Sequence, residues 1–252
     1  MRELQELITA TQAYFASDFQ AGSRNPPTSF AAFASDALGR LSSSVTPQMC
    51  LDYFRSHPKC QQTYEGRKFS SEDYTLFRTD DFALDVYFWL KQDTSIHDHS
   101  FHGAFRVLEG QNLQIDFDFQ DCEEAKSTGV KSWTFGNLKL RDRRLQAPGT
   151  FQKIEHGAGF IHQVIHMTPV VVTLCLRTIR TDSKPAHLYF YPELRVQTSR
   201  FVSELPSDVF ESSEPSSWYE KLKTEKGMDG PRLERALRSH HAYVSSIQKL
   251  KG

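Results

Sequence analysis

The sequence lacks an excess of charge of either sign. Its 252 residues include 30 Lys and Arg and 31 Asp and Glu, for a formal net charge of −1. Proteins that bind nucleic acid by neutralising phosphates carry an excess of Lys and Arg, and so do polybasic segments that bind anionic membrane surfaces. The charge balance argues against both classes. We therefore expect a small-molecule substrate and no nucleic-acid or membrane partner.

Long hydrophobic runs and cysteine motifs are also missing. The longest strongly apolar stretch, Val170–Leu176, is far shorter than the ~18 residues of a membrane-spanning helix. The N-terminal MRELQELITATQAYF mixes charged and apolar residues, unlike a signal peptide. The four cysteines form no CxxC pair and are too few for a disulfide scaffold. We therefore expect a cytoplasmic protein with reduced thiols.

Hydrophobic residues follow two different periods along the chain. Residues 1–67 show helical spacing and predict an N-terminal helical region. Residues 68–196 resemble short strands separated by turns, with strict alternation from Leu113 to Phe119, and predict a β-sandwich or barrel. Residues 197–252 predict a linker and a C-terminal helix that begins at Gly230-Pro231. The expected fold is mainly β, a barrel or jelly roll with helices at both ends.

Six of the ten histidines gather in two short segments of the predicted strand region. Side chains alternate across a strand, so His97 and His99 share a face, and His162 and His166 share one by the same parity. Two imidazoles from one strand and one from another can form a three-nitrogen face that leaves metal positions open for substrate and O₂. The 19 phenylalanines are numerous enough to line a ligand cavity.

These segments resemble the two motifs of the cupin superfamily. The first is His97-Asp-His99 followed by the turn Val107-Leu-Glu-Gly110, and the second is Gly159-Phe-Ile-His162. The resemblance covers about residues 82–192, and it implies a cupin-type β-barrel with a metal on His97, His99 and His162. Iron(II) is the expected ion, with Zn²⁺, Mn²⁺ and Ni²⁺ as alternatives, because ligand type alone does not select among them.

The metal-binding glutamate usual in the first cupin motif falls on Gly103. A three-His cupin without this glutamate is similar to the thiol dioxygenases, although their Ser-x-His-x-Tyr strand is replaced here by Thr173-Leu-Cys-Leu-Arg177, without the tyrosine. Three neutral imidazoles leave Fe(II) its full +2 charge. Such a site favours a small anionic substrate, with thiols among the candidates.

Two further residues, Arg177 and His166, are expected to be catalytic. Arg177 shares the parity of Thr173 and Cys175 and is opposite to an aliphatic face, so it would face the barrel interior and bind a substrate carboxylate. An exposed arginine at the strand end is the alternative interpretation. Arg106 points outward by parity and is not expected in the site.

The remaining polar and aromatic residues near the motifs have less specific expected roles. We expect an apolar cavity wall that includes Phe101, Phe105 and Phe160. Three residues are expected to support the ligands or hold a second metal: His102, Glu155 and His156. Four histidines outside the motifs are expected at the surface: His57, His187, His240 and His241.

The sequence thus predicts a non-heme Fe(II)-dependent cupin dioxygenase. Two alternatives stay open. One is a metal-dependent isomerase, lyase or hydrolase that uses the ion as a Lewis acid, and the other is a non-catalytic ligand-binding cupin. Cupins frequently pair through sheet edges, so the resemblance also implies a homodimer.

Overall fold

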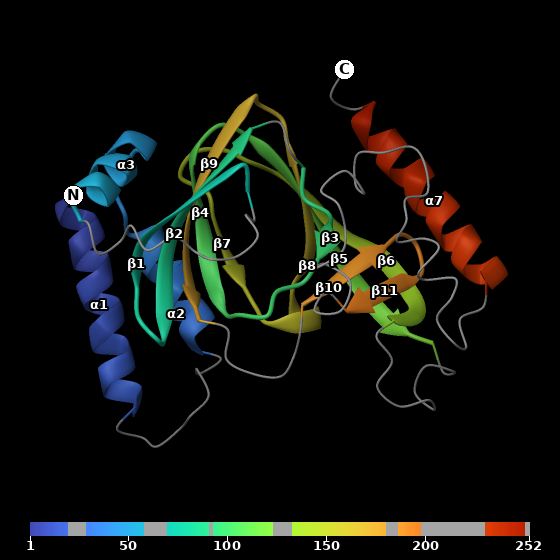
Figure 1. Ribbon diagram of the computed structural model, residues 1–252, viewed down its shortest axis with the longest axis horizontal. Helices are drawn as coiled ribbons and strands as arrows, with labels where there is room; N and C mark the ends of the chain where they lie inside the picture. The colour runs from blue at the N-terminus through green and yellow to red at the C-terminus, as the bar shows by residue number, and fades with distance from the viewer. Residues whose placement is uncertain are drawn as a thin grey trace.

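The computed structural model describes residues 1–19, 29–57, 70–90, 93–122, 133–179, 186–197 and 230–249. Strands are the most frequent regular structure in this part of the chain, and they form two groups (Figure 1). One is a five-stranded sheet in the order β1 (Glu72–Arg78), β2 (Phe82–Leu90), β9 (Val170–Thr178), β4 (Gly103–Glu109) and β7 (Phe151–Ile154). The other closes into a six-stranded barrel in the order β10 (His187–Phe190), β11 (Leu194–Gln197), β6 (Trp133–Gln146), β5 (Asn112–Asp121), β8 (Ile161–His166) and β3 (Ile96–His97). The mainly β fold predicted from the alternating residues is confirmed.

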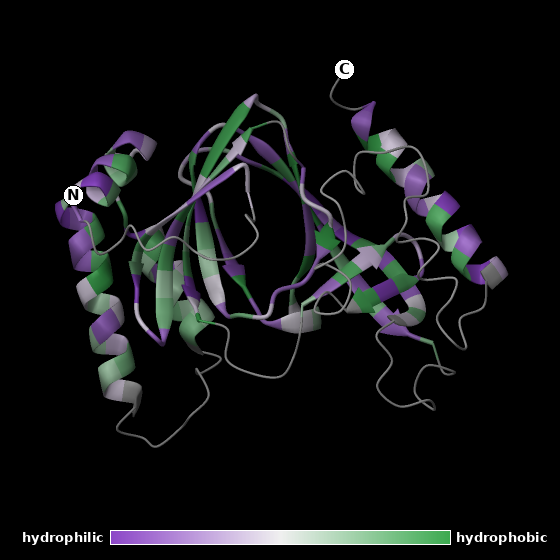
Figure 2. Cartoon of the chain, in the orientation of Figure 1, coloured by the Kyte–Doolittle hydropathy of each residue, from purple (hydrophilic) through white to green (hydrophobic). Residues whose placement is uncertain are grey.

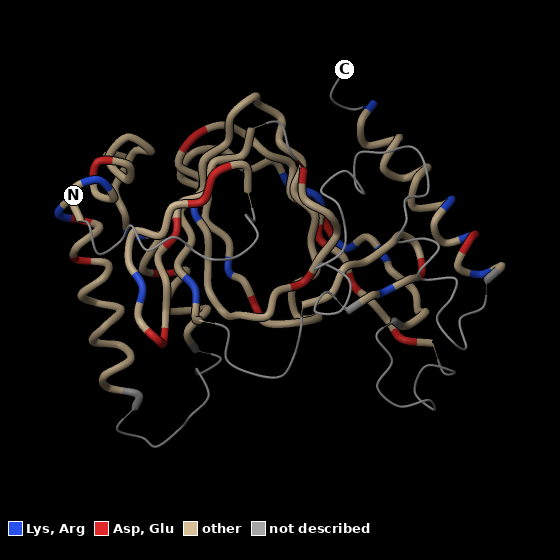
Figure 3. The backbone as a smooth tube through the Cα atoms, in the orientation of Figure 1, with Lys and Arg blue, Asp and Glu red and all other residues tan. Residues whose placement is uncertain are grey.

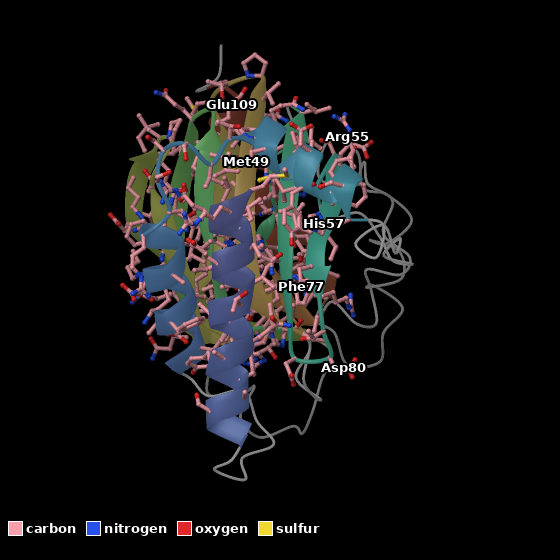
Figure 4. The ribbon with its side chains drawn as sticks, turned by 90° about the vertical axis from the view of Figure 1, so that its left-hand side faces the viewer. Met49, Arg55, His57, Phe77, Asp80 and Glu109 are labelled. Atoms are coloured by element: carbon pink, nitrogen blue, oxygen red, sulfur yellow. The ribbon has the colours of Figure 1, made fainter. Side chains whose placement is uncertain are left out.

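Three N-terminal helices cover the outer face of the five-stranded sheet. They are α1 (Arg2–Phe19), α2 (Ser29–Gly39) and α3 (Pro47–Ser56), and Figure 4 looks onto this layer, with Met49 labelled on α3 and Phe77 on β1. Three aliphatic residues at even positions of β9 pack beneath the helices, because burying them removes apolar surface from water. The shared cluster includes Val172, Leu174, Leu176, Leu4, Phe30 and Leu38.

Arg106 of β4 lies between this sheet and the helices. It points outward, as its parity predicts, yet it is only 7% exposed. Its Nη1 donates to the carbonyl oxygens of Leu38 at 2.7 Å and Leu41 at 2.6 Å. Carbonyl groups at a helix C-terminus have no partner within the helix. Arg106 therefore satisfies the end of α2 and fixes the helical layer to the sheet.

The C-terminal helix α7 (Gly230–Gln248) covers the barrel on the opposite side of the molecule (Figure 1). Its apolar and polar residues alternate in a helical pattern (Figure 2). Leu233 and Ala236 are buried in a cluster with Leu194, and the Tyr243 hydroxyl donates to Gln163 Oε1 at 2.6 Å. Helices at both ends of a β fold are thus confirmed, while the predicted linker after residue 197 lies outside the described residues.

Three of the four histidines expected at the surface are half-buried instead. His57 stacks on Tyr53 with ring centroids 4.0 Å apart. His187 Nδ1 lies 2.9 Å from Asp98 Oδ2, and His240 Nδ1 accepts the backbone N–H of Tyr191 at 3.0 Å. The contacts of His187 and His240 join segments that are distant in sequence, so strand and helix periodicity could not reveal them. His241 is exposed as expected.

Charged residues are interspersed along both groups of strands (Figure 3). No helix in the described ranges combines the length and the hydropathy of a membrane span.

Candidate metal centre

Three histidines meet between the five-stranded sheet and the barrel. His97 ends β3 and lies directly opposite His162 of β8 in register, and His99 follows two residues after His97. Their ligand nitrogens all lie within 4.8 Å of one another. The three side chains are buried, each 4–6% exposed. In the part of the chain that the structure describes, this is the group with the geometry of a metal site.

The donor set fits a transition-metal ion. Two imidazole nitrogens that bind one ion at about 2.0–2.1 Å are roughly 2.9–3.4 Å apart, and the Nε2 atoms of His99 and His162 are 3.0 Å apart. His97 Nδ1 lies 2.8 Å from the carbonyl oxygen of Ser95. This contact keeps the proton on Nδ1 and leaves Nε2 as the ligand atom.

The protein environment keeps these imidazoles neutral. Burial lowers the pKa of His97. It lowers the pKa values of His99 and His162 well below the ordinary value, and the neighbouring His97 lowers both further. Neutral imidazole is the form that binds a metal. On β5, the Gln114 carboxamide nitrogen lies 3.0 Å from His162 Nδ1 and donates to Asp116 at 2.7 Å, which holds the His162 ring in place.

Gly103 lies on the inner face of β4, where the cupin glutamate would fall. A Cβ atom here would collide with the carbonyl oxygen of Leu176 and approach Arg177 Cα to 2.9 Å. Gly103 is therefore required by the close approach of β4 to β9. A glutamate at position 103 would not fit as a fourth ligand, because the backbone of β9 occupies the space that its Cβ needs.

A cavity opens from the three histidines between the two layers of strands. Its wall is mostly apolar, and the expected Phe101 and Phe105 belong to it. Phe160 instead packs against the ligand rings, 4.4 Å from His162 and 6.0 Å from His99 between ring centroids. The other lining residues are Tyr87, Trp89, Thr94, Asn112, Ile154, Val164, His166, Thr173 and Cys175. Burial raises the pKa of Cys175 to about 12, so it is a neutral thiol in this wall.

Arg177 faces the interior, as its parity predicts, but its partner was not foreseen. Its Nε donates to Asp85 Oδ2 at 2.7 Å, with side-chain exposures of 13% and 3%. Asp85 also accepts from the Tyr87 hydroxyl at 3.1 Å and from Thr75 at 2.7 Å. The guanidinium lies 5.6 Å from the ring of Phe101, which in turn packs against His99. A protein carboxylate thus takes the place of the expected substrate carboxylate at Nε.

His166 shares the inner face of β8 with His162 but lies at the other end of the cavity. It is opposite Asn112 in register, whereas His162 is opposite Asp116. Its ring stacks on Trp89 with centroids 5.0 Å apart. Parity placed His166 on the correct face, and the register shows that it lies too far along the strand to join the ligands.

The other residues expected near the metal form a separate group beyond the ligands. His102 Nδ1 lies 3.3 Å from Glu155 Oε2, and the rings of His102 and His156 are 5.7 Å apart. Lys153 pairs with Glu155 at 2.9 Å. Within the described ranges these residues do not complete a second set of metal ligands.

Sequence reasoning missed Asp85, Tyr87 and Asn112. Strand 82–90 is apolar on both faces apart from Asp85, and a single acidic residue in such a strand is the signal that could have been used, since buried charges need partners. Burial, with the nearby Asp85, raises the pKa of Tyr87 well above its ordinary value, so its hydroxyl stays protonated.

The sequence matches no protein-family model and no curated protein. Several solved structures are similar to parts of this chain. Hydroquinone 1,2-dioxygenase from Sphingomonas sp. TTNP3 is 6% identical over 46% of this chain and 70% of that one, with a TM-score of 0.33. A cupin superfamily protein from Desulfitobacterium hafniense is 13% identical over 46% and 83%, with a TM-score of 0.30. DMSP lyase DddQ from Ruegeria pomeroyi is 15% identical over 75% and 96%, with a TM-score of 0.37.

Proposed function

We propose that this protein is a cupin-type, Fe(II)-dependent oxygenase that acts on a small anionic substrate. The observation that carries the proposal is the donor set. Three buried neutral imidazoles converge, and no carboxylate joins them among the described residues. Such a set leaves the ion a full +2 charge and open positions, which favours an anionic ligand together with O₂.

The chain's own residues prepare this chemistry. His97, His99 and His162 hold the ion, which when bound supplies a site for O₂ and for the anionic group of the substrate. Phe101 and Phe105 line the adjoining wall and keep water away from the reacting groups. Oxygen chemistry in a wet site would release reactive products, so an apolar wall suits an oxygenase better than a hydrolase, which needs water.

Arg177 and the Tyr87 hydroxyl extend this site on the side of His99. Asp85 holds the guanidinium through Nε, which fixes the direction of its terminal nitrogens. Arg177 then binds the anionic head of the substrate, and the Tyr87 hydroxyl, which donates to Asp85 Oδ2, helps to hold that carboxylate in place. The Asp85 contact makes this a positioned guanidinium rather than a mobile one.

The test uses protein purified without oxygen and loaded with Fe(II). Metal analysis should find about one ion per chain, and oxygen uptake should follow addition of small thiols or carboxylates. His99→Ala should lose most of the metal with its circular dichroism unchanged. The matched control His241→Ala, at an exposed position, should keep both.

Two outcomes would overturn the proposal. Full metal occupancy in His99→Ala would exclude this ligand set. Stoichiometric metal without oxygen uptake, combined with turnover in the absence of oxygen, would assign the ion a Lewis-acid role in an isomerase, lyase or hydrolase.

A further inference from the structure

The cavity has two ends that differ in chemistry. The three histidines lie at one end, where His162 of β8 is opposite Asp116 of β5. At the other end lies the pair Asn112 and His166. The two pairs are four residues apart, which is about 13 Å along a strand at ~3.4 Å per residue. Because Asn112 and His166 still line the cavity, the space extends well beyond the metal.

Asn112 is the distinctive residue of this far end. It is 0% exposed, and neither its Oδ1 nor its Nδ2 has a hydrogen-bond partner among the described residues. The two threonine hydroxyls of the cavity wall accept hydrogen bonds from other groups, Thr173 from the Trp89 indole at 3.1 Å and Thr94 from the backbone of Val164 at 2.8 Å, and neither donates to Asn112. A buried carboxamide without partners has lost its hydrogen bonds to water without replacement, so a ligand that supplies them gains affinity.

The charges around the cavity decide what kind of group fits there. The residues that line it include no Lys, Arg, Asp or Glu. Arg177 lies on the side of His99 and Phe101, at the metal end. At this end the Asp93 carboxylate already accepts the backbone N–H of His166 at 2.9 Å and lies 4.0 Å from its Nδ1. A charged group beside Asn112 would therefore be desolvated without an opposite charge of its own, which is costly. A neutral group that both donates and accepts hydrogen bonds matches the carboxamide instead.

We propose that Asn112 determines substrate specificity by binding a neutral polar tail, such as a carboxamide or hydroxyl, at the end of the cavity opposite the metal. The substrate is then an elongated molecule with an anionic head and an uncharged polar tail. This inference rests on the proposed function, because that function places the head at the three histidines. Thr94, Thr173 and Val164 shape the surroundings of the tail.

The experiment measures binding to the Co²⁺-loaded protein through the absorption of the cobalt–thiolate bond. The probes are ω-mercaptoalkanamides with two, three or four methylenes, each compared with the thiol that carries an isopropyl group in place of the carboxamide. The best-fitting amide should bind wild type roughly tenfold more tightly than its isopropyl isostere. Asn112→Leu, which keeps the volume, should abolish or reverse this preference.

Two controls separate specificity from folding. Gln146 is another fully buried carboxamide, opposite Asn112 on β6 and not part of the cavity wall, so Gln146→Met should keep the amide preference. If Asn112→Leu does not fold, Asn112→Ala replaces it and should show the same loss. Cobalt content and the affinity for ethanethiol should be equal in wild type and variants, since the head site is untouched.

The outcomes distinguish this inference from the proposed function. Equal affinity of wild type for amide and isopropyl probes, or an amide preference that survives in both Asn112 variants, would overturn the tail site. If no thiol changes the cobalt spectrum, the metal-bound head is wrong, and the tail site is tested in metal-free protein with butanamide. Stabilisation of wild type but not of Asn112→Leu in thermal unfolding would then support it, and equal stabilisation would reject it.

Discussion

The buried pair of Arg177 and Asp85 gives a sharp test of the electrostatics at this site. Their N–O distance is 2.7 Å and their side chains are 13% and 3% exposed. Arg40 and Asp36 form a pair with the same 2.7 Å distance, but their side chains are 69% and 68% exposed. The two pairs differ in burial and in the hydrogen bonds that Asp85 also accepts from Thr75 and Tyr87, and a double-mutant cycle isolates the part due to the ion pair itself.

Removing one partner of the buried pair should be far more costly than removing one partner of the exposed pair. Asp85→Asn leaves a guanidinium with little access to water, which costs about 3–5 kcal/mol. Asp36→Asn breaks a screened surface pair, worth about 0–1 kcal/mol. For a chain of this size, the buried change should lower the melting temperature by roughly 6–20 °C, at about 2–4 °C per kcal/mol.

The assay is urea unfolding followed by circular dichroism, applied to a double-mutant cycle for each pair. Asp85→Asn combined with Arg177→Met should be less damaging than the sum of the single changes, with a coupling energy of about 2 kcal/mol or more. The cycle on Asp36 and Arg40 should give less than about 0.5 kcal/mol. Equal coupling energies would refute the argument that burial makes Asp85 the essential partner of Arg177.

Three further predictions follow from single contacts. Gly103→Ala should lower the melting temperature without changing metal affinity, because the added Cβ meets the backbone of Leu176. Arg177→Lys should raise KM more than it lowers metal content, since lysine keeps the charge but loses the planar fork. Burial lowers the pKa of His240 to about 4, below the ~6.5 of an unfolded chain. Between these values the unfolded state binds more protons, so stability should fall as the pH drops from about 6.5 to 4, and much less so in His240→Gln by urea unfolding.

Strand parity predicted the faces of this protein well. Thr173 and Cys175, at odd positions of strand 170–178, do line the cavity, and Val172, Leu174 and Leu176, at even positions, do pack beneath the helices. The same rule placed His97 on the inner face. The resemblance to the second cupin motif identified His162 as a further candidate ligand. Both inferences depend only on alternation within a strand, which is a local property of the backbone.

Parity could not give the position of a residue along its strand. His162 and His166 have the same parity, yet they lie four positions apart in the register of β8 against β5. That register depends on which strands become neighbours, and β5 and β8 are separated by β6 and β7 in the sequence. For the same reason, the sequence did not show that Asp85 of β2 would meet Arg177 of β9.

His99 lies outside the two strands that carry His97 and His162. β3 ends at His97, and His99 pairs through a single bridge with His156, where its carbonyl oxygen accepts the N–H of Gly157 at 2.8 Å. Gly157 has a φ of +63°, a conformation that favours glycine. This bridge turns the chain after β3 across the start of β8, so that His99 reaches the nitrogen of His162. A side chain at Gly157 would strain this turn, and we infer that the closeness of the ligand nitrogens depends on a residue that carries no ligand of its own.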